Sequence, residues 1–587
     1  MNSLEYSART TVNVQEKANL IWAIADKLVG TFKPHEYGLV VLPMCVIKRF
    51  NDTLLPTREA VLKKNEEIKA QFLQVKEGFL CTASGYRFYN TSRFTLQTLL
   101  SDPDNIEANF RSYLAAFSDN VVDIIEKFDF DKEITKLANN NILFNVIQEF
   151  CTKKADMSPE LVSSADMGYI FEELVRKFSE SYDEQAGAHF TARDVIYLMT
   201  DLLISPKREE MMREGVTATV YDMAMGTSQM LGCMEERLKG VDPDATVVLF
   251  GQELNEQTFA IAKADMLIKG GYADNMRHGN TLSDDKFSGY TFDYIISNPP
   301  FGIEWKNERE KVTAENTRGE SGRFAPGLPS ISDSQQLFLL NGAAKLKASG
   351  RMAIIQNGSP LFSGDAGSGP SEIRGYLLEN DWLEAIVQMP NDLFYNTGIS
   401  TFIWLVTKDK SQERAGRVQL IDASKCFVKR RKSLGNKRNE FSDECIRLIL
   451  KAYDANLDGL WEENGLAVES KVFDRFEFKY SKVTVERPLL DEKGIPVLKR
   501  GLLQPDTALR DAEIIPWGMD LDAYMAENVL PYAPDAWVDH GKTKIGYEIP
   551  FTRYFYKYVP PRPSTEIFAR LKELQADEDA LIRGWDA

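Results

Sequence analysis

The chain has 587 residues, with 70 Lys and Arg against 87 Asp and Glu, which leaves a formal net charge of −17. Proteins that coat nucleic acid need a basic surface, so this balance argues against that class. Hydrophobic residues make up 43% of the chain and charged residues 27%, as in an ordinary globular protein. Because no apolar run can span a bilayer and no signal core is visible, we expect a soluble, cytoplasmic protein of several domains.

The cysteines and histidines predict neither a metal centre nor a redox pair. None of the six cysteines forms a C-x-x-C pair, and the four histidines are far apart in sequence. A Walker-type phosphate loop is also missing, because Ala536 stands where the first glycine before Gly541-Lys542-Thr543 should be. These absences argue against a metalloenzyme and a nucleotide-hydrolysing motor.

Three regions are expected in chain order. Residues 1–155 are predicted to be helical, because apolar residues recur there at helical spacing. Residues 156–425 alternate β-rich runs with helical stretches, which predicts an α/β domain with a parallel sheet and helices on both faces. The predicted strands are 217–221, 246–250, 292–297, 351–356, 383–389 and 401–406. Ligands of such sheets bind beyond the carboxyl ends of the strands.

The third region, residues 426–587, is predicted to be partly helical and partly irregular. It ends in a helix, 564–582, whose apolar stripe is expected to dock on this chain or on a partner. Two segments remain open to interpretation. The segment 302–333 is either a mobile lid or a surface insertion. The stretch 425–438 carries seven basic residues and no acid, so it is either a solvated face or a phosphate contact.

The strongest chemical signal is the run FDYIISNPPFG at 292–302. A buried strand enters Asn-Pro-Pro-Phe, and two prolines can neither continue the strand nor donate to its ladder. The stiff turn can aim the Asn298 side-chain oxygen and the Pro299 carbonyl at one point. Two acceptors there suit a planar amine with two N–H donors, and Phe301, after Pro300, offers an aromatic face for its ring.

This motif resembles the catalytic motif of N6-adenine DNA methyltransferases, most closely the modification subunit of type I restriction-modification systems. Other segments resemble that family in the same order: 186–199, 222–231, 250–255, 279–282, 389–401, 421–427 and 542–558. The resemblance implies a Rossmann-like S-adenosylmethionine-dependent methyltransferase domain, with a helical N-terminal domain and a C-terminal extension.

The resemblance also implies a cofactor, S-adenosylmethionine, and the residues that hold it. The glycine loop would approach the methionine part, Glu253 would accept the ribose hydroxyls, and Asn280 would meet the adenine. The loop before Arg193 would hold the carboxylate end. The implied cofactor-binding residues are Ala188, His189, Phe190, Thr191, Ala192, Arg193, Asp222, Gly226, Thr227, Ser228, Glu253 and Asn280. No metal is implied.

The implied reaction transfers a methyl group directly to the N6 of an adenine that has flipped out of the duplex. Partners implied by the resemblance are a specificity subunit, flanked by two modification subunits, and a motor-nuclease subunit. Double-stranded DNA would be reached through that complex. Much of the DNA recognition would then come from the partner, which reconciles a DNA enzyme with an acidic chain.

The sequence departs from the family at the glycine loop, where Met223, Ser228 and Gln229 replace a proline and two glycines. Ala192 stands where proline is usual and Asn280 where aspartate is common. These departures question the affinity for the cofactor, and they keep open a non-enzymatic subunit acting in assembly and DNA clamping. A methyltransferase of RNA or protein also remains open, whereas the missing G-x-G-x-x-G disfavours a nicotinamide dehydrogenase.

Overall fold

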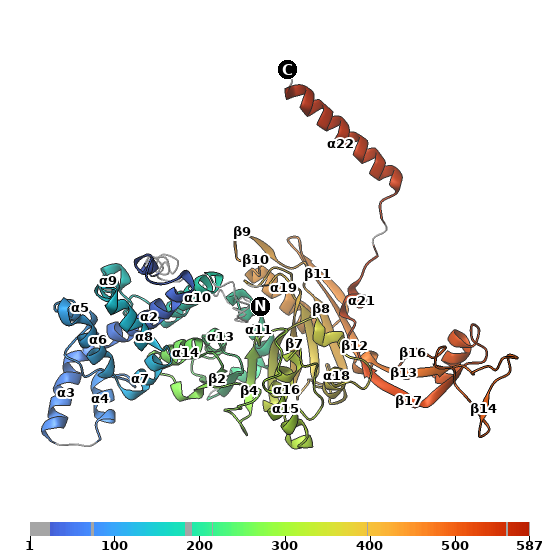
Figure 1. Ribbon diagram of the computed structural model, residues 1–587, viewed down its shortest axis with the longest axis horizontal. Coiled ribbons are helices and arrows are strands. Elements are labelled where there is room, and N and C mark those ends of the chain that lie inside the picture. Colours follow the sequence, from blue (N-terminus) through green and yellow to red (C-terminus); the bar gives the residue numbers. More distant parts are fainter. Residues whose placement is uncertain are drawn as a thin grey trace. The chain divides into compact units, whose positions relative to one another are not determined.

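A computed structural model describes residues 21, 24–71, 75–181, 191–213, 215–395, 397–558 and 561–585. The chain forms two compact units, Met1–Ile549 and Pro550–Ala587 (Figure 1). No helix within the described ranges is both long and apolar enough to cross a membrane.

The N-terminal part of the first unit is helical, as predicted. Its centre is α2 (Tyr37–Leu54), in which every residue except Leu39 is buried. Arg49 of α2 donates to the carbonyls of Met157 and Val162, and Asp52 accepts from the Met157 N–H at 2.8 Å. The other helices are α3 (Arg58–Ala70), α4 (Glu77–Ser84), α5 (Leu96–Leu99), α6 (Ile106–Ala115), α7 (Asp119–Glu126), α8 (Phe130–Asn139), α9 (Leu143–Phe150) and α10 (Ser164–Ser181).

A ten-stranded sheet forms the middle of this unit, in the order β11-β12-β8-β6-β7-β5-β4-β1-β2-β3. All six predicted strands are present within it: β1 (Thr217–Asp222), β2 (Thr246–Glu253), β4 (Phe292–Ser297), β5 (Leu346–Asn357), β6 (Leu383–Gln388) and β7 (Thr401–Thr407). The sequence pattern missed β3 (Met276–His278), β8 (Arg417–Asp422), β11 (Gly459–Glu463) and β12 (Leu466–Asp474). The last two extend the sheet beyond residue 425.

The sheet is mixed, which differs from the parallel sheet predicted by strand and helix alternation. β7 runs antiparallel to both β5 and β6, between which it is inserted. No helix is described between β6 and β7, whereas a parallel neighbour is usually reached through a helical crossover. All seven residues of β7 are buried, so both faces of the sheet are covered there.

Helices pack against this sheet along its length (Figure 1). α11 (Arg193–Ile204) lies against β5, α13 (Gln229–Val241) and α19 (Asp443–Ala455), while α14 (Glu256–Ile268) contacts β2, β3 and the N-terminal α2 and α7. α16 (Gln335–Lys345) contacts β5 and α18 (Gly369–Glu379). The α14 contacts join the N-terminal helices to the edge of the sheet that carries β1–β3.

The C-terminal region, predicted to be partly helical and partly irregular, contains a second sheet. β13 (Lys479–Glu486) lies between β16 (Asp511–Pro516) and β17 (Trp537–Tyr547), all antiparallel, and a short hairpin pairs β14 (Leu498–Lys499) with β15 (Leu502–Leu503). The second unit contains α21 (Phe551–Phe555) and α22 (Ser564–Trp585), so the predicted terminal helix begins at its expected residue.

A buried ionic cluster joins the two halves of the large sheet. Arg351 of β5 and Glu384 of β6 are 3% and 2% exposed, and they form an ion pair across the end of β7. The Tyr453 hydroxyl of α19 donates to Glu384 at 2.7 Å, and Arg414 lies 3.9 Å from the same carboxylate. Removing the carboxylate would leave buried positive charge without a counter-ion.

We therefore predict that Glu384→Ala lowers the free energy of unfolding by about 3–5 kcal/mol. The matched control is Glu462→Ala on β11, an exposed carboxylate whose loss should cost less than about 0.5 kcal/mol. Chemical denaturation of both variants measures the difference. Equal stability of the two variants would contradict the role assigned to the cluster.

Candidate active site

Two neighbouring parallel strands bring the predicted motifs together at their carboxyl ends. Val220 of β1 lies opposite Tyr294 of β4, so both strands end at the same edge. There the Ser297 hydroxyl donates to Asp222 Oδ1 at 2.7 Å, and the Ala224 N–H donates to the same oxygen at 3.0 Å. The first loop and the Asn-Pro-Pro-Phe turn are thereby tied to each other.

The turn after β4 holds its asparagine in a defined place. Asn298 is 8% exposed, and its Nδ2 donates to the Thr191 hydroxyl at 2.8 Å. Pro299 is buried, whereas Pro300 and Phe301 are half-buried, with Phe301 against the main core. The hydrogen bond to Thr191 fixes the plane of the Asn298 amide. Sequence reasoning placed both residues at the site but missed this contact between them.

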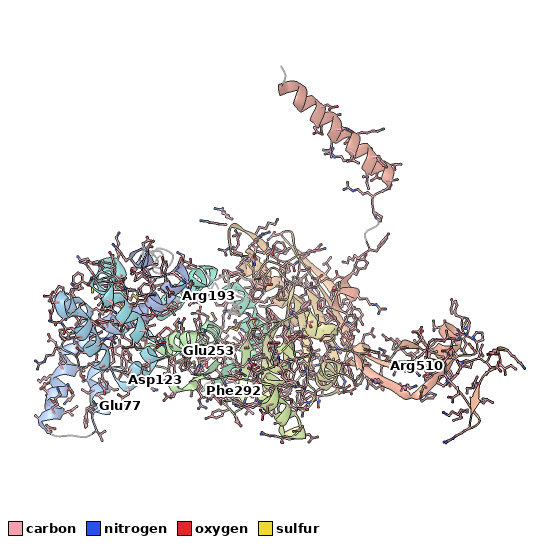
Figure 2. The ribbon with its side chains drawn as sticks, in the orientation of Figure 1. Glu77, Asp123, Arg193, Glu253, Phe292 and Arg510 are labelled. Carbon is pink, nitrogen blue, oxygen red and sulfur yellow. The ribbon has the colours of Figure 1, made fainter. Side chains whose placement is uncertain are left out.

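The glycine loop between β1 and α13 is held by Glu253 at the end of β2, which Figure 2 labels. The two oxygens of its carboxylate accept from the N–H groups of Gly226 and Asn255, each at 2.8 Å. Gly226 has φ 52°, and a Cβ there would project into open space. Since each carboxylate oxygen has a further lone pair, Glu253 can still accept from a ligand.

The residues that depart from the family's glycine loop take up defined roles. Ser228 keeps the left-handed backbone, with φ 65°, directly before α13. A non-glycine residue there costs on the order of 1 kcal/mol. Gln229 accepts from Arg193 Nη2 at 2.7 Å, and the Arg193 guanidinium lies 3.2 Å from the centre of the Tyr169 ring. Arg193 is thus fixed beside the loop.

The third predicted motif lies beside the same loop. The Thr281 hydroxyl donates to the Met223 carbonyl at 2.6 Å, and the Gly279 N–H donates to the Glu253 carbonyl at 2.9 Å. Asn280 accepts from the Leu282 N–H with Oδ1 and donates from Nδ2 to Glu308 at 2.9 Å. Asn280 therefore links the strand end to the segment after the Asn298 turn.

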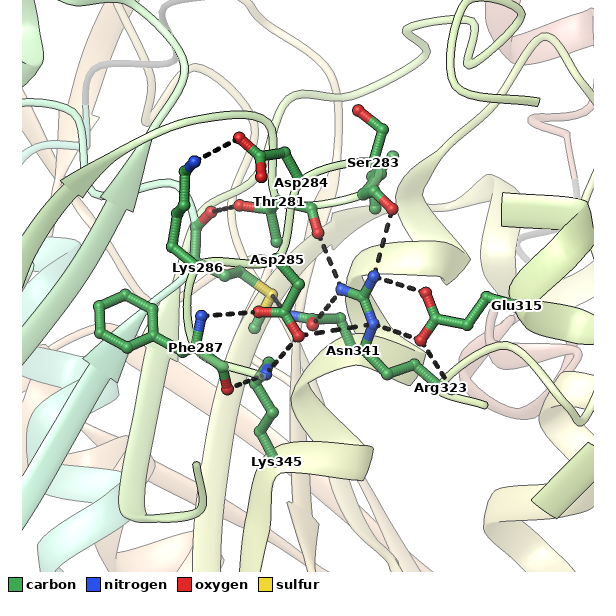
Figure 3. A network of polar contacts seen from close by, with 12 residues as sticks. Thr281, Ser283, Asp284, Asp285, Lys286, Phe287, Glu315, Arg323, Asn341 and Lys345 are labelled. Atoms are coloured by element: carbon green, nitrogen blue, oxygen red, sulfur yellow. Dashed lines mark hydrogen bonds and ion pairs between the residues drawn. The ribbon is translucent and has the colours of Figure 1, made fainter. Parts of the chain in front are cut away.

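That segment, 302–333, is held by an arginine that the sequence analysis did not single out (Figure 3). Arg323 forms a two-pronged ion pair with Glu315 of α15 (Arg309–Asn316), with both N–O distances at 2.7 Å. Its Nη1 donates to the Thr281 carbonyl at 2.8 Å and to Asn341 at 2.9 Å. These contacts fasten the segment to the third motif.

The predicted cofactor-binding residues fall into three groups. The structure joins Asp222, Gly226, Glu253 and Asn280 through the contacts above. Thr227 and Ser228 are buried in the same loop, and Thr191, Ala192 and Arg193 precede or begin α11. Ala188, His189 and Phe190 lie outside the described residues. In the part of the chain that the structure describes, no group of three His, Cys, Asp or Glu residues could hold a metal ion.

Burial changes the acidity of two carboxyl groups here. Desolvation raises the pKa of Asp222 to about 7, against the lowering effect of the hydrogen bonds from Ser297 and Ala224. Desolvation also raises the pKa of Glu253, despite the backbone N–H groups that it accepts from. The site thus combines backbone N–H donors, a strand-end carboxylate that accepts hydrogen bonds and an amide that can do both, which suits a ligand with donors and acceptors of its own.

The raised pKa of Asp222 makes stability depend on pH. The folded chain keeps this proton up to about pH 7, whereas the unfolded chain releases it near its ordinary value of 3.8, so stability falls as pH rises between the two. We predict that Asp222→Asn makes the free energy of unfolding less dependent on pH, by up to ~1.4 kcal/mol for each pH unit in this range. Melting curves of both proteins from pH 4.5 to 7.5 test it. A stability difference that does not change with pH would contradict it.

Residues 162–484, more than half of the chain, match the family model "N-6 DNA Methylase", and residues 17–150 match "HsdM N-terminal domain". The type I restriction enzyme MjaIX methylase subunit of Methanocaldococcus jannaschii is 22% identical, over 75% of this chain and 77% of its own. The MpnII methylase subunit of Mycoplasma pneumoniae is 25% identical, over 74% and 83%.

A solved structure has the same fold. The methyltransferase subunit of a type I restriction-modification system from Streptococcus thermophilus superposes with a TM-score of 0.60 at 22% identity. The match covers 79% of this chain and 97% of that one.

Proposed function

This chain belongs to the N-6 DNA methylase family, and we propose that its Asn298 turn methylates adenine N6 in DNA with S-adenosylmethionine as methyl donor. The matching N-terminal domain makes it the modification subunit of a type I restriction-modification system. The observation that carries the residue assignment is the joining of the Asn298 turn to the glycine loop through Ser297 and Asp222.

The residues at the strand ends suit S-adenosylmethionine, which supplies an electrophilic methyl group when bound. Open space over Gly226 lets backbone N–H groups approach a ligand closely. Glu253 would accept the ribose hydroxyls, and Asn280 would meet the adenine. The loop ending in Thr191, Ala192 and Arg193 would hold the carboxylate end, where the Arg193 charge is complementary.

The altered glycine loop is compatible with this role. Ser228 retains the left-handed backbone that a glycine would adopt, so the path of the loop does not depend on the missing glycine. Gln229 replaces the other glycine at the start of α13, where it positions Arg193. We therefore favour a subunit that binds its cofactor over one kept only for assembly.

The chemistry assigned to Asn298 and Pro299 is positioning and electrostatic stabilisation. The exocyclic amine of adenine is a weak nucleophile because its lone pair is conjugated with the ring. N–H groups that donate to Asn298 Oδ1 and to the Pro299 carbonyl would favour a tetrahedral nitrogen with its lone pair free to attack. As positive charge develops on that nitrogen, the two acceptors stabilise it more strongly.

Phe301 would receive the adenine after it leaves the duplex. An adenine inside the helix cannot present N6 to the site, so base flipping is required. The half-buried ring of Phe301 lies three residues beyond Asn298, with the rigid Pro299-Pro300 pair between them. Stacking on this ring would offset part of the cost of unstacking the base.

We predict that Asn298→Ala lowers kcat for DNA methylation by about 10²–10³-fold, with the affinity for S-adenosylmethionine unchanged within about twofold. Transfer of a labelled methyl group to DNA in the assembled complex measures the first quantity, and calorimetric titration the second. Normal methylation by this variant would refute the role of Asn298.

The matched control is Thr191→Val, which keeps the catalytic amide but removes the hydroxyl that holds it. Its kcat should fall by only about tenfold, since the amide is freed but present. The same assay with RNA and protein as acceptors separates the alternatives, because label entering only those substrates would overturn the assignment to DNA.

The partners are proposed to be a specificity subunit and a motor-nuclease subunit, with two copies of this chain per specificity subunit. The helix α22 is the proposed docking element. Its Ile567, Phe568, Leu571 and Leu574 are 44–65% exposed, which is unusual for four large apolar residues on one helix. A partner helix that covers this stripe would remove it from water.

We predict that Leu571→Ser together with Leu574→Ser abolishes co-purification with the specificity subunit, because these substitutions disrupt the apolar stripe. The control pair, Lys572→Gln with Glu573→Gln, changes two neighbouring polar residues of α22 and should leave the complex intact. If the complex also survives the two serine substitutions, α22 is not the docking element.

A further inference from the structure

The basic stretch at 425–438 forms a separate element of structure. β9 (Val428–Leu434) and β10 (Lys437–Glu440) pair as an antiparallel hairpin outside the large sheet. We call residues 425–440 the basic hairpin. Its turn contains Gly435, with φ 56°. The positive charge of this short element contrasts with the net charge of −17 on the whole chain.

Most of the positive charge of the hairpin faces solvent. Arg430 forms an ion pair with Glu440. Lys437 is buried, with its Nζ 2.9 Å from Asp194 Oδ2, so these two cations stabilise the fold. The other five are exposed, and none forms an ion pair with a residue that the structure describes: Lys425, Lys429, Arg431, Lys432 and Arg438. Five like charges gathered on one element repel one another, which favours an anionic partner.

A cavity lies beside the basic hairpin and is lined partly by its cationic side chains. It measures ≈ 480 Å³ and is lined by Asp392, Phe427, Lys429, Arg430, Ser433, Arg438 and Asn439. Lys429, Arg438 and the Ser433 hydroxyl supply donors there, whereas Arg430 pairs with Glu440 and the Asn439 amide donates to the Asn391 carbonyl. Asp392 is the one acid among these lining residues. The lining is therefore one that prefers an anion.

The hairpin is rigidly placed by its backbone. The N–H groups of Arg438 and Asn439 both donate to the Asp392 carbonyl, at 2.9 and 3.1 Å, and the Asn436 N–H donates to the Tyr395 carbonyl at 2.9 Å. These hydrogen bonds involve only backbone groups, so they do not engage the long cationic side chains. A rigid backbone with exposed cations loses little backbone entropy on binding.

The residues that hold the hairpin in place are also connected to the Asn298 turn. Asp194 accepts from Lys437 and from the Phe441 N–H at 2.8 Å, and it stands three residues after Thr191, which holds Asn298. The cationic hairpin and the catalytic amide are therefore attached to the two ends of one short segment. This connection favours a ligand that reaches both, which a nucleic acid substrate does.

We propose that the basic hairpin binds the phosphodiester backbone of the DNA whose adenine is methylated at Asn298. The inference rests on the proposed function. Lys429, Arg431 and Lys432 stand within four residues of β9, where its pairing with β10 is irregular, and together they present a cluster of charge to a row of phosphates. Contacts of this kind position the DNA without reading its sequence.

The test is the triple variant Lys429→Gln, Arg431→Gln, Lys432→Gln, which removes exposed charges and none of the anchoring contacts. Binding of the full chain, in its assembled complex, to a short duplex is measured by fluorescence anisotropy over a range of salt concentrations. Affinity should fall at least about tenfold at moderate salt, equally for different DNA sequences. The slope of log K against log salt should become shallower by about 0.9 for each phosphate that the variant no longer neutralises.

The matched control is Lys493→Gln, Lys499→Gln, Arg500→Gln, which removes the same charges from exposed positions near β14. This variant should keep the wild-type slope. An unchanged slope in the hairpin variant, or equally weakened binding in the two variants, overturns the proposal. So does a failure of complex assembly with DNA binding retained, which would assign the hairpin to an acidic protein surface.

Failure of this proposal is distinguishable from failure of the proposed function. The hairpin variant should raise the KM for DNA while kcat at saturating DNA stays within about twofold, because Asn298 is untouched. Asn298→Ala should show the reverse pattern. If only the hairpin variant behaves like the wild type, the methyltransferase assignment still stands.

Discussion

The parallel register of β1 and β4 is the constraint on which the site depends. It places the carboxyl end of each strand at one edge of the sheet, and the bond from Ser297 to Asp222 closes the remaining gap. A shift of one residue in this register would turn every side chain of the shifted strand to the opposite face of the sheet. The positions of the glycine loop and of the Asn298 turn are therefore set by the core, where apolar burial is the dominant stabilising contribution.

Buried and half-buried polar groups extend this arrangement outward in a chain of short contacts. Asp222 accepts from Ser297 and Ala224, Glu253 accepts from Gly226 and Asn255, and Arg323 donates to the third motif. Buried polar groups are costly unless paired, so each such pairing favours one loop conformation over others. The result is a site whose groups are already in position before a ligand binds. Catalysis by positioning depends on this, because little entropy is then lost in reaching the reactive geometry.

The distribution of charge explains how an acidic chain can act on DNA. The net charge of −17 repels phosphate, which opposes indiscriminate binding along a genome. Seven of the 70 Lys and Arg residues stand in one anchored hairpin, and that hairpin is tied to the segment 191–194, which also holds Asn298. An acidic chain with one basic hairpin would bind DNA productively only when the specificity subunit is present and the DNA backbone lies against the hairpin.

The sequence by itself was enough to predict the chemistry, because the residues that would carry the chemistry are contiguous in the chain. Asn-Pro-Pro-Phe after an apolar strand, a glycine turn after another, and an acid at the end of a third are local patterns, and the six strands that include them were predictable from β-rich runs. Only the tertiary structure decided the antiparallel insertion of β7, the pairing of Thr191 with Asn298, and the clamp made by Arg323. These features join residues that are distant in sequence, and no local pattern encodes which distant partner a buried polar group will find.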